Sequence, residues 1–259
     1  METVRAKKFL GQHFLNDENV AQRIVQSLTG QTRQVLEVGP GMGVLTKYLL
    51  AMPDLTLRAV ELDRESVDYL ALHYPSLRVV EGDFLRLDLT TMFHGPFAVV
   101  GNFPYNISSQ ILFRVFDHRD TVPELVGMFQ KEVAERVAAG PGSKTYGILS
   151  VLLSAFYRIE YLFTVPETVF SPPPKVKSAV IRMLRNEVNR LECDENLFVS
   201  VVKTGFNQRR KTLRNALRSL PVSFEAVPPR LLQLRAEQLS VDDFVSLTAA
   251  LRPLNSHRT

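Results

Sequence analysis

The chain of 259 residues contains one cysteine, Cys193, and no tryptophan. A single cysteine excludes a disulfide within the chain and any zinc site made of several cysteines. Four of the five histidines, His73, His94, His118 and His257, are not spaced as metal ligands, and we predict no metal site. Low cysteine content is typical of proteins in a reducing compartment, and we expect this protein to be cytoplasmic.

Long apolar segments are also missing. The longest mostly apolar run covers residues 146–157, which is shorter than the roughly 20 residues needed to span a bilayer. Residues 1–8 lack the apolar core of a signal peptide. We therefore expect no interaction with a membrane.

Strand and helix patterns alternate from residue 34 to about residue 139, in a chain that is 45% hydrophobic. Such alternation predicts parallel βαβ units in a doubly wound α/β sheet of the Rossmann-like kind. Two further strands, at 158–165 and 178–184, could form an antiparallel pair at one edge. The expected parallel strands are 35–38, 57–61, 77–81, 97–100 and 124–129, with helices at 108–116 and 131–139.

Strand patterns stop after about residue 186. Apolar residues at helical spacing predict helices at 197–206, 209–220 and 241–251. Ser240 and Asp243 have the spacing of a capping box at the start of the last helix. We therefore expect an α/β domain at 1–186 and a small all-helical domain at 187–259.

A glycine-dense turn, Gly39-Pro40-Gly41-Met42-Gly43, follows the first predicted strand. A dinucleotide-binding turn has the spacing G-x-G-x-x-G and holds a pyrophosphate with backbone N–H groups. Here the spacing is G-x-G-x-G and Pro40 has no N–H, which favours a nucleoside cofactor without phosphates. We predict that Gly39 and Gly41 contact that cofactor.

The next two predicted strands are each followed or ended by an acid. Glu61 lies 22 residues after Gly39, where an acid accepts hydrogen bonds from ribose hydroxyls. Asp83 can accept a hydrogen bond from an adenine amine, with Phe84 against the ring. One such acid is more often a solvated carboxylate, but three successive strand ends with this chemistry are far less expected by chance. Together they predict S-adenosylmethionine as the cofactor.

The fourth predicted strand runs into Asn102-Phe103-Pro104-Tyr105. The Asn102 side-chain oxygen and a backbone carbonyl beside Pro104 can accept hydrogen bonds from an exocyclic amine. Tyr105 can stack on the ring that carries the amine. A turn alone would also explain these residue types, but with the upstream motifs they predict a site for an amino-substituted base.

The net charge of +4 is too small to indicate a nucleic-acid partner by itself. Its placement is more informative, since residues 203–218 contain six basic side chains and no acid. We predict that this basic segment, together with Lys7 and Lys8, contacts RNA phosphates, while the commoner role of a solvated helix face stays open. The six are Lys203, Arg209, Arg210, Lys211, Arg214 and Arg218.

In this order the motifs resemble those of the rRNA adenine N6,N6-dimethyltransferases, especially the bacterial small-subunit (16S) family linked to kasugamycin sensitivity. The resemblance covers nearly the whole chain. The sequence differs in having His13 where many members carry Asn, and Phe103 where Leu or Ile is more usual. The matching segments are 11–17, 37–41, 61–63, 82–83, 102–108, 130–136 and 170–176.

The resemblance implies a methyltransferase sheet dependent on S-adenosylmethionine, followed by a small helical domain. It implies that His13 and Leu15 close over the cofactor and that Asn102 also lines its site. The implied substrate is two adjacent adenines in the hairpin loop near the 3′ end of 16S rRNA, methylated within a precursor of the small ribosomal subunit. Tyr105 and Phe170 would stack on the two faces of the adenine, with a core position as the other role open to Phe170. We expect a monomer.

Three other functions fit parts of the sequence. A 23S rRNA adenine methylase of the macrolide-resistance type shares the Asn102 motif, but segments 11–17 and 170–176 favour the small-subunit enzyme. A ribosome-assembly factor with little turnover would keep the basic segment, and the intact 102–105 motif argues against binding alone. The glycine spacing and Pro40 disfavour an NAD-dependent oxidoreductase.

Overall fold

The computed structural model describes residues 4–254, and the chain divides into two compact units. Unit 1 is Met1–Glu135 with Arg158–Arg185, and unit 2 is Arg136–Tyr157 with Asn186–Thr259. We expected one domain to run without interruption to residue 186. The chain instead enters unit 2 at residues 136–157, returns to unit 1 for three strands, and then completes unit 2.

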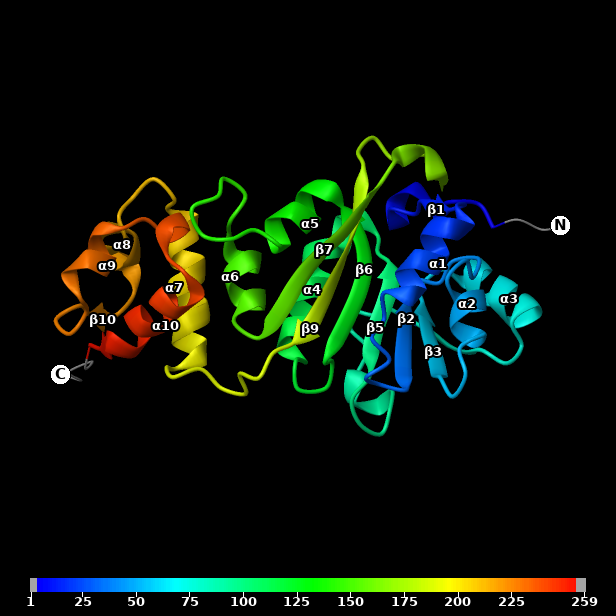
Figure 1. Cartoon of the computed structure of the whole chain (residues 1–259), viewed down its shortest axis with the longest axis horizontal. Coiled ribbons are helices and arrows are strands. Elements are labelled where there is room, and N and C mark those ends of the chain that lie inside the picture. Colours follow the sequence, from blue (N-terminus) through cyan, green and yellow to red (C-terminus); the bar gives the residue numbers. More distant parts are fainter. Residues whose placement is uncertain (1–3, 255–259) are drawn as a thin grey trace. The chain divides into compact units, whose positions relative to one another are not determined.

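Helices and strands alternate through unit 1 (Figure 1). The α-helices and strands of both units, within residues 4–254, have the following bounds. The α-helices are α1 (Glu18–Gln26), α2 (Thr46–Leu50), α3 (Arg64–His73), α4 (Ser108–Asp117), α5 (Lys131–Val137), α6 (Ile148–Ser154), α7 (Glu195–Asn207), α8 (Leu213–Ala216), α9 (Pro229–Gln233) and α10 (Val241–Ala250). The strands are β1 (Phe14–Leu15), β2 (Gln34–Val38), β3 (Thr56–Glu61), β4 (Arg78–Glu81), β5 (Ala98–Asn102), β6 (Glu124–Gln130), β7 (Tyr157–Val165), β8 (Phe170–Ser171), β9 (Ser178–Arg185), β10 (Val222–Ser223) and β11 (Arg252–Pro253).

The main sheet has the strand order β4-β3-β2-β5-β6-β9-β7 (Figure 1). Neighbouring strands from β4 to β6 are parallel, and β9 is antiparallel to β6. The predicted Rossmann-like α/β sheet is therefore confirmed. The chain proceeds from β2 toward β4 on one side and from β5 toward β6 on the other. In open α/β sheets such a switch of direction leaves a crevice at the carboxyl ends of the two central strands, here β2 and β5.

The central strands are buried on both faces because their sequences are almost continuously apolar. In β5 the residues from Ala98 to Gly101 are buried, and in β6 every residue except Gln130 is buried. Burial on both faces explains why these strands read as apolar runs rather than as alternating patterns. The rigid centre of the sheet thus ends directly at Asn102.

The N-terminal lead, which we define as residues 7–15, crosses to a segment far away in sequence. A 3₁₀ turn, η1 (Lys8–Leu10), precedes β1, which pairs antiparallel with β8 so that Leu15 lies opposite Phe170. Two-residue strands carry no periodicity, so the sequence did not predict this pairing. It fixes the lead beside the proline-rich segment 172–174.

In unit 2, α6 and α10 both pack on α7. The predicted capping box at the start of α10 is confirmed, since the Ser240 hydroxyl accepts a hydrogen bond from Asp243 N at 3.1 Å. The predicted helix at 209–220 is wrong. The α7 helix ends at Asn207, residues 208–212 form a turn, and the short α8 and η5 (Leu217–Ser219) follow.

The interruption of the predicted helix between α7 and α8 has a physical cause. Thr212 is extended (φ −64°, ψ 154°), and Leu213 N donates to the carbonyl of Leu234 rather than to a preceding turn. The apolar stripe that suggested one helix survives in part, because Leu213 and Leu217 are fully buried. The basic residues at 209–211 therefore lie on a turn and not on a helix face. Within residues 4–254, no helix is long and apolar enough to cross a membrane.

Candidate active site

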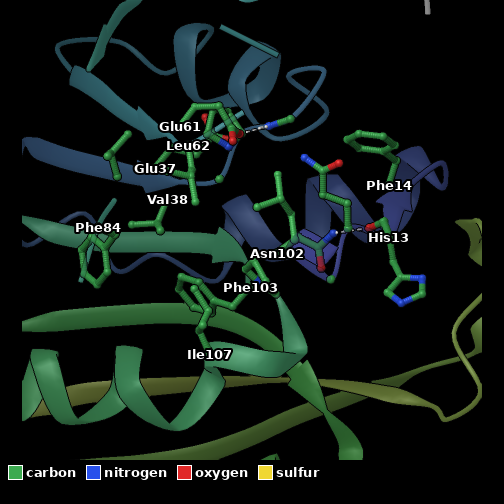
Figure 2. Close-up of a pocket in the computed structure, with 18 of the residues that line it drawn as sticks. His13, Phe14, Glu37, Val38, Glu61, Leu62, Phe84, Asn102, Phe103 and Ile107 are labelled. Carbon is green, nitrogen blue, oxygen red and sulfur yellow. Dashed lines mark hydrogen bonds between the residues drawn. The ribbon is translucent and has the colours of Figure 1, made fainter. Parts of the chain in front are cut away.

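A pocket lies at the carboxyl ends of β2 and β5, and the N-terminal lead forms part of its wall (Figure 2). Four successive strand ends contribute Gly39, Glu61, Asp83 and Asn102 to it. Every predicted cofactor-binding residue lines this pocket, as do most of those predicted to be catalytic. The predicted residues found in its lining are His13, Leu15, Gly39, Gly41, Glu61, Asp83, Asn102, Phe103, Pro104 and Tyr105.

The glycines after β2 leave room in the pocket and allow close packing beside it. Gly39 and Gly41 have left-handed backbones, with φ of +69° and +57°. A Cβ on Gly39 would meet no atom within 4 Å, so the position faces open space. A Cβ on Gly41 would come within 2.9 Å of the Phe14 ring. Gly39 therefore provides a surface for a ligand, and Gly41 lets the lead close over the turn.

Glu61 is held by backbone N–H groups at the end of β3. Its Oε2 accepts a hydrogen bond from Gly41 N at 3.0 Å and its Oε1 accepts one from Asp63 N at 2.9 Å. Burial raises the pKa of Glu61 and these backbone hydrogen bonds oppose that rise. The carboxylate has lone pairs left over, because each oxygen can accept more than one hydrogen bond. It can therefore accept from a pair of vicinal hydroxyls without moving.

Asp83 lies beyond the end of β4, its side chain is 33% exposed, and its Oδ2 lies 3.6 Å from Arg86 Nε. Its Oδ1 accepts a hydrogen bond from Leu85 N at 2.9 Å, which fixes the side chain beside the buried ring of Phe84. Both residues line the pocket. An acceptor next to an apolar ring at this position suits the amino edge of a purine.

Asn102 ends β5 and points toward the lead (Figure 2). Its Nδ2 donates a hydrogen bond to the backbone carbonyl of His13 at 2.9 Å. Since the nitrogen of the amide is used in this way, the oxygen Oδ1 is the atom left to act on a ligand as an acceptor. An uncharged acceptor at the pocket wall suits an exocyclic amine.

The side chain of Phe103 belongs to the core. It is 1% exposed, and its ring lies over two glycines of the sheet, Gly101 and Gly127, and 4.9 Å from the ring of Phe129. A Cβ on Gly127 would come within 2.1 Å of the Phe103 ring. The sheet has space for this phenylalanine only because both positions are glycine. Phe103 can therefore act on a ligand through its backbone.

Tyr105 is fixed by contacts at its ring and at its hydroxyl. Its ring stacks on His13, with centroids 5.3 Å apart and planes at 28°. Its hydroxyl lies 2.5 Å from the Ser178 hydroxyl, and burial raises its pKa. His13 in turn has its Nδ1 2.7 Å from the carbonyl oxygen of Pro172. The His13 imidazole is thus engaged by other residues of the protein, although it lines the pocket.

Phe170, which we predicted to stack on the substrate base, lies elsewhere. It is 4% exposed, it belongs to the buried core, and it is not part of the pocket lining. Its place opposite Leu15 in the β1–β8 pair explains its burial. In this structure Phe170 has the other role that the sequence left open, that of a core residue.

The contacts of Lys7 also differ from those expected of the RNA-binding residue that we predicted. Its ammonium forms an ion pair with the buried carboxylate of Asp63 and another with Glu65 at 3.1 Å. Gln12 Nε2 donates to Asp63 Oδ2 at 3.1 Å, and Lys7 N donates to Gln12 Oε1 at 2.7 Å. Lys7 is thus neutralised by two carboxylates and anchors the lead to the start of α3. Lys8 is exposed, as a phosphate contact requires.

Sequence reasoning missed Glu37, which lines the pocket from β2 and is 1% exposed. Burial raises its pKa to about 8, although a hydrogen bond from Thr46 Oγ1 at 2.6 Å acts in the opposite direction. A carboxyl group within an otherwise apolar strand was the signal available. Asp63 and Gln12 were also missed, because their importance depends on a contact between residues 51 positions apart.

The predicted RNA-binding residues of unit 2 are exposed but not equivalent. Arg209 Nη2 donates to the carbonyls of Lys144 and Tyr146, each at 3.0 Å. Arg209 therefore holds the 144–146 segment in place. No such contact is found for Arg210, Lys211 or Arg214 among residues 4–254, so these cations are available to a ligand.

The pocket fits the cofactor predicted from the sequence. Open space at Gly39, a fixed carboxylate at Glu61 and an acceptor at Asp83 match the parts of an adenosine group. Among the described residues, those that line the pocket include no Lys or Arg that could hold a pyrophosphate, which suits a cofactor without one. Within residues 4–254, no group of three or more His, Cys, Asp or Glu residues could hold a metal ion. His257 lies outside the described residues.

Comparison with known proteins decides the family. The model of the family described as ribosomal RNA adenine dimethylase matches residues 3–251. The chain belongs to this family. It is therefore an S-adenosylmethionine-dependent rRNA adenine dimethyltransferase, and the prediction of cofactor and reaction from the sequence is confirmed. Membership rules out the NAD-dependent oxidoreductase considered above.

Two similar proteins are both called ribosomal RNA small subunit methyltransferase A. The one from Cytophaga hutchinsonii is 59% identical over 255 residues, covering 97% of this chain and 99% of that protein. The one from Parabacteroides distasonis is 60% identical over 255 residues, covering 96% of this chain and 94% of that protein.

Two solved structures share the fold over most of the chain. A dimethyladenosine transferase from Plasmodium falciparum has a TM-score of 0.74 at 25% identity, covering 91% of this chain and 96% of that one. The 23S rRNA methyltransferase ErmE has a TM-score of 0.68 at 25% identity, covering 91% and 98%. The fold of this chain is thus shared with a dimethyladenosine transferase and with a 23S rRNA methyltransferase.

Proposed function

We propose that this protein dimethylates N6 of two adjacent adenines in the 3′-terminal hairpin loop of 16S rRNA. It acts on a precursor of the small ribosomal subunit, as a monomer in the cytoplasm, and contributes to subunit maturation. Relatives at 59% and 60% identity that are called small-subunit methyltransferases support the choice of rRNA. The single structural observation that carries the chemistry is the hydrogen bond from Asn102 Nδ2 to the His13 carbonyl, which fixes the amide. No hydrogen bond to Asn102 Oδ1 is found among residues 4–254, so this oxygen can accept one from a ligand.

The residues around Asn102 would orient the amine of the target adenine. Before the first transfer, Asn102 Oδ1 accepts a hydrogen bond from one N6–H and the Phe103 carbonyl accepts one from the other. These hydrogen bonds favour a pyramidal nitrogen with its lone pair directed into the pocket. S-adenosylmethionine, when bound, supplies an electrophilic methyl group. Orientation of reacting groups can contribute up to roughly 7–11 kcal/mol in the best cases. A neutral amide suffices because the N6 proton can leave after methyl transfer, so no strong base is needed.

The target adenine must leave its stack to reach this position, and loop bases are extruded at lower cost than paired ones. We assign the face of Tyr105 that His13 does not cover to the extruded base. The Ser178 hydrogen bond and the His13 contact hold this ring in advance, which lowers the entropic cost of stacking. Phe170 has no part in this arrangement.

Glu61 and Asp83 are assigned to the cofactor. Glu61 accepts hydrogen bonds from the two ribose hydroxyls while Gly41 N and Asp63 N hold its carboxylate in place. Asp83 accepts from the adenine amine of the cofactor. Leu15 and the lead, which line the same pocket, would cover the bound molecule.

A comparison of ribosomal substrates tests the proposal against its alternatives. Small and large subunits from a strain lacking these methyl groups are each incubated with the protein and labelled S-adenosylmethionine. The proposal predicts label in 16S rRNA and none in 23S rRNA. Label in 23S rRNA would identify a large-subunit methylase, and tight binding to the small subunit without label would identify an assembly factor.

A further inference from the structure

Phe9 is the most exposed large hydrophobic side chain among residues 4–254, with 79% of its surface accessible. Single exposed apolar residues are common on soluble proteins, so exposure alone has no meaning. Its surroundings are unusual, however. Phe9 is the middle residue of η1, within the lead that forms one wall of the active-site pocket.

The lead brings Phe9 close to the catalytic residues. Leu10 and Gly11, which follow it directly, both line the pocket. Gly11 packs so tightly on the loop after β5 that a Cβ there would come within 2.6 Å of Asn106 Oδ1. The Cα atoms of Phe9 and Gly11 are two residues apart and so at most about 7.6 Å from each other. Phe9 therefore lies next to the pocket wall, although it does not itself line the pocket.

The turn that presents Phe9 is firmly held. Leu10 N donates to the Lys7 carbonyl at 3.0 Å and Gly11 N donates to the Lys8 carbonyl at 3.0 Å, which closes η1. The same turn is tied to α3 by the ion pair of Lys7 with Asp63. An aromatic ring on an anchored turn loses little entropy when it contacts a partner.

Positive charge lies in the same part of the chain. Arg5 and Lys8 are both exposed, and neither has an ion-pair partner among residues 4–254. Single-stranded nucleic acid is bound by this combination of stacking aromatic rings and cations that contact the backbone. The two neighbours of Phe9 in η1 are Lys8, which is exposed and basic, and Leu10, which lines the pocket. An exposed cation therefore lies next to the exposed ring on the same turn, which favours a nucleic-acid strand over a protein as the partner.

We propose that Phe9 stacks on a base of the rRNA strand one or two positions from the adenine in the pocket, with Lys8 on an adjacent phosphate. This inference rests on the proposed function. Nucleotides in a stacked strand are about 3.4 Å apart, so a flanking base reaches the place where Phe9 projects. With two adjacent target adenines, the one that is not being methylated is a natural occupant. Phe9 is thus a positioning residue for the substrate strand.

Binding and turnover of four proteins test this role: wild type, Phe9→Ala, Phe9→Tyr and Leu72→Ala. Leu72 is a matched control, since it is 73% exposed on α3 and does not line the pocket. The affinity for unmethylated small subunits is measured by co-sedimentation, together with KM, kcat and the affinity for S-adenosylmethionine. Loss of one base–aromatic stack predicts a Kd for subunits about 5- to 150-fold weaker in Phe9→Ala.

The expected pattern is a raised Kd and KM in Phe9→Ala, with cofactor affinity unchanged, while Phe9→Tyr and Leu72→Ala behave as wild type. Subunit affinity in Phe9→Ala equal to wild type would overturn the proposal. Binding is measured separately from turnover, so this result cannot be confused with a failure of the proposed function. That function would be contradicted if the wild-type protein bound subunits but did not methylate them.

A fluorescence measurement distinguishes RNA from protein as the occupant. The chain has no tryptophan, so Phe9→Trp introduces a single reporter. A synthetic RNA hairpin with two adjacent loop adenines should quench this tryptophan, while the same RNA should not quench Leu72→Trp. Suppose that Phe9→Ala weakens binding to subunits but the hairpin binds Phe9→Trp without quenching its fluorescence. Position 9 then contacts a ribosomal protein, and the proposal of base stacking is wrong.

Discussion

Asn102 and His13 are joined by a hydrogen bond of 2.9 Å from the Asn102 side-chain nitrogen to the His13 backbone oxygen. The two residues are 89 positions apart, and the bond connects the end of a central strand to the N-terminal lead. It fixes the orientation of the amide, so that the oxygen is presented as an acceptor. Because the acceptor is the backbone carbonyl of His13, this hydrogen bond does not depend on which side chain occupies position 13.

Substitution of Asn102 should remove catalysis while preserving the fold. We expect Asn102→Ala to lower the single-turnover rate by about 100-fold or more, the usual effect of removing a preorganised polar group from an active site. Asn102→Asp is the matched variant, since it keeps an acceptor but cannot donate to the His13 carbonyl. It should also be slow. A rate for Asn102→Ala near that of wild type would exclude the proposed role.

Glu61 should determine cofactor affinity. Removing a charged hydrogen-bonding group of this kind costs about 1.5–3 kcal/mol, which corresponds to a roughly ten- to hundredfold weaker Kd. Glu61→Ala should show this loss in calorimetric titration with S-adenosylmethionine. Glu61→Gln retains one acceptor and should lose less. Equal affinity in all three proteins would show that the ribose is bound elsewhere.

Glu37 should make the free energy of unfolding depend on pH. Its pKa is raised from 4.5 to about 8 in the folded protein, so the folded state holds a proton that the unfolded state has lost between these values. This contribution to stability is present below about pH 4.5 and decreases as pH rises to 8, by at most about 1.4 kcal/mol per pH unit. Glu37→Gln, which keeps an acceptor for Thr46, should show a shallower decrease.

Urea unfolding of wild type and Glu37→Gln at pH 6 and pH 8 measures this difference. Other buried acids, such as Glu61 and Glu124, also have raised pKa values and contribute to the slope of wild type. The comparison of the two proteins isolates Glu37. Parallel slopes in the two would mean that Glu37 titrates normally in the folded state.

Two neighbouring lysines should have different roles. Lys7→Ala leaves the buried Asp63 without its cation, so it should loosen the lead and weaken cofactor binding. Lys8→Ala should leave cofactor binding unchanged and lower the slope of log K against log salt for subunit binding by about one. Titrations of both variants with cofactor and with subunits check this. A reversal of the two effects would restore Lys7 as an RNA contact.

The turn after α7 should bind RNA through some of its cations only. Reversing the charge of Arg210 and Lys211 should weaken subunit binding and reduce its salt dependence. Arg209→Glu should in addition lower the melting temperature, because the Arg209 side chain holds the Lys144 and Tyr146 carbonyls. Melting curves of the two variants separate these roles. A double variant that binds subunits normally would place the RNA surface elsewhere.

The sequence predicted the parts of the site that follow directly from strand ends. Gly39, Glu61, Asp83 and Asn102 each come just after or at the end of a parallel strand, and the topology of such a sheet brings these ends together. Contacts between distant segments were not predictable in this way. The β1–β8 pair, the Lys7–Asp63 ion pair and the burial of Phe170 all depend on where the lead packs against segments distant in sequence.

The errors in unit 2 have a similar origin. The apolar spacing that predicts a helix at 209–220 includes Leu213 and Leu217, which are indeed buried. The same spacing also occurs in a turn followed by a short helix, which is what the structure contains. The deciding interaction is the bond from Leu213 N to the Leu234 carbonyl, which is not local in sequence. The insertion of residues 136–157 into unit 2 was missed for the same reason.

The central claim is that the Asn102 amide directs dimethylation of two adjacent 16S rRNA adenines. The most direct test is to incubate unmethylated small subunits with wild type or Asn102→Ala, digest the 3′ end of the 16S rRNA and identify its nucleosides by mass spectrometry. We predict two N6,N6-dimethyladenosines with wild type and unmodified adenosines with Asn102→Ala. Unmodified adenosines with wild type, or dimethyladenosines with Asn102→Ala, would contradict the account.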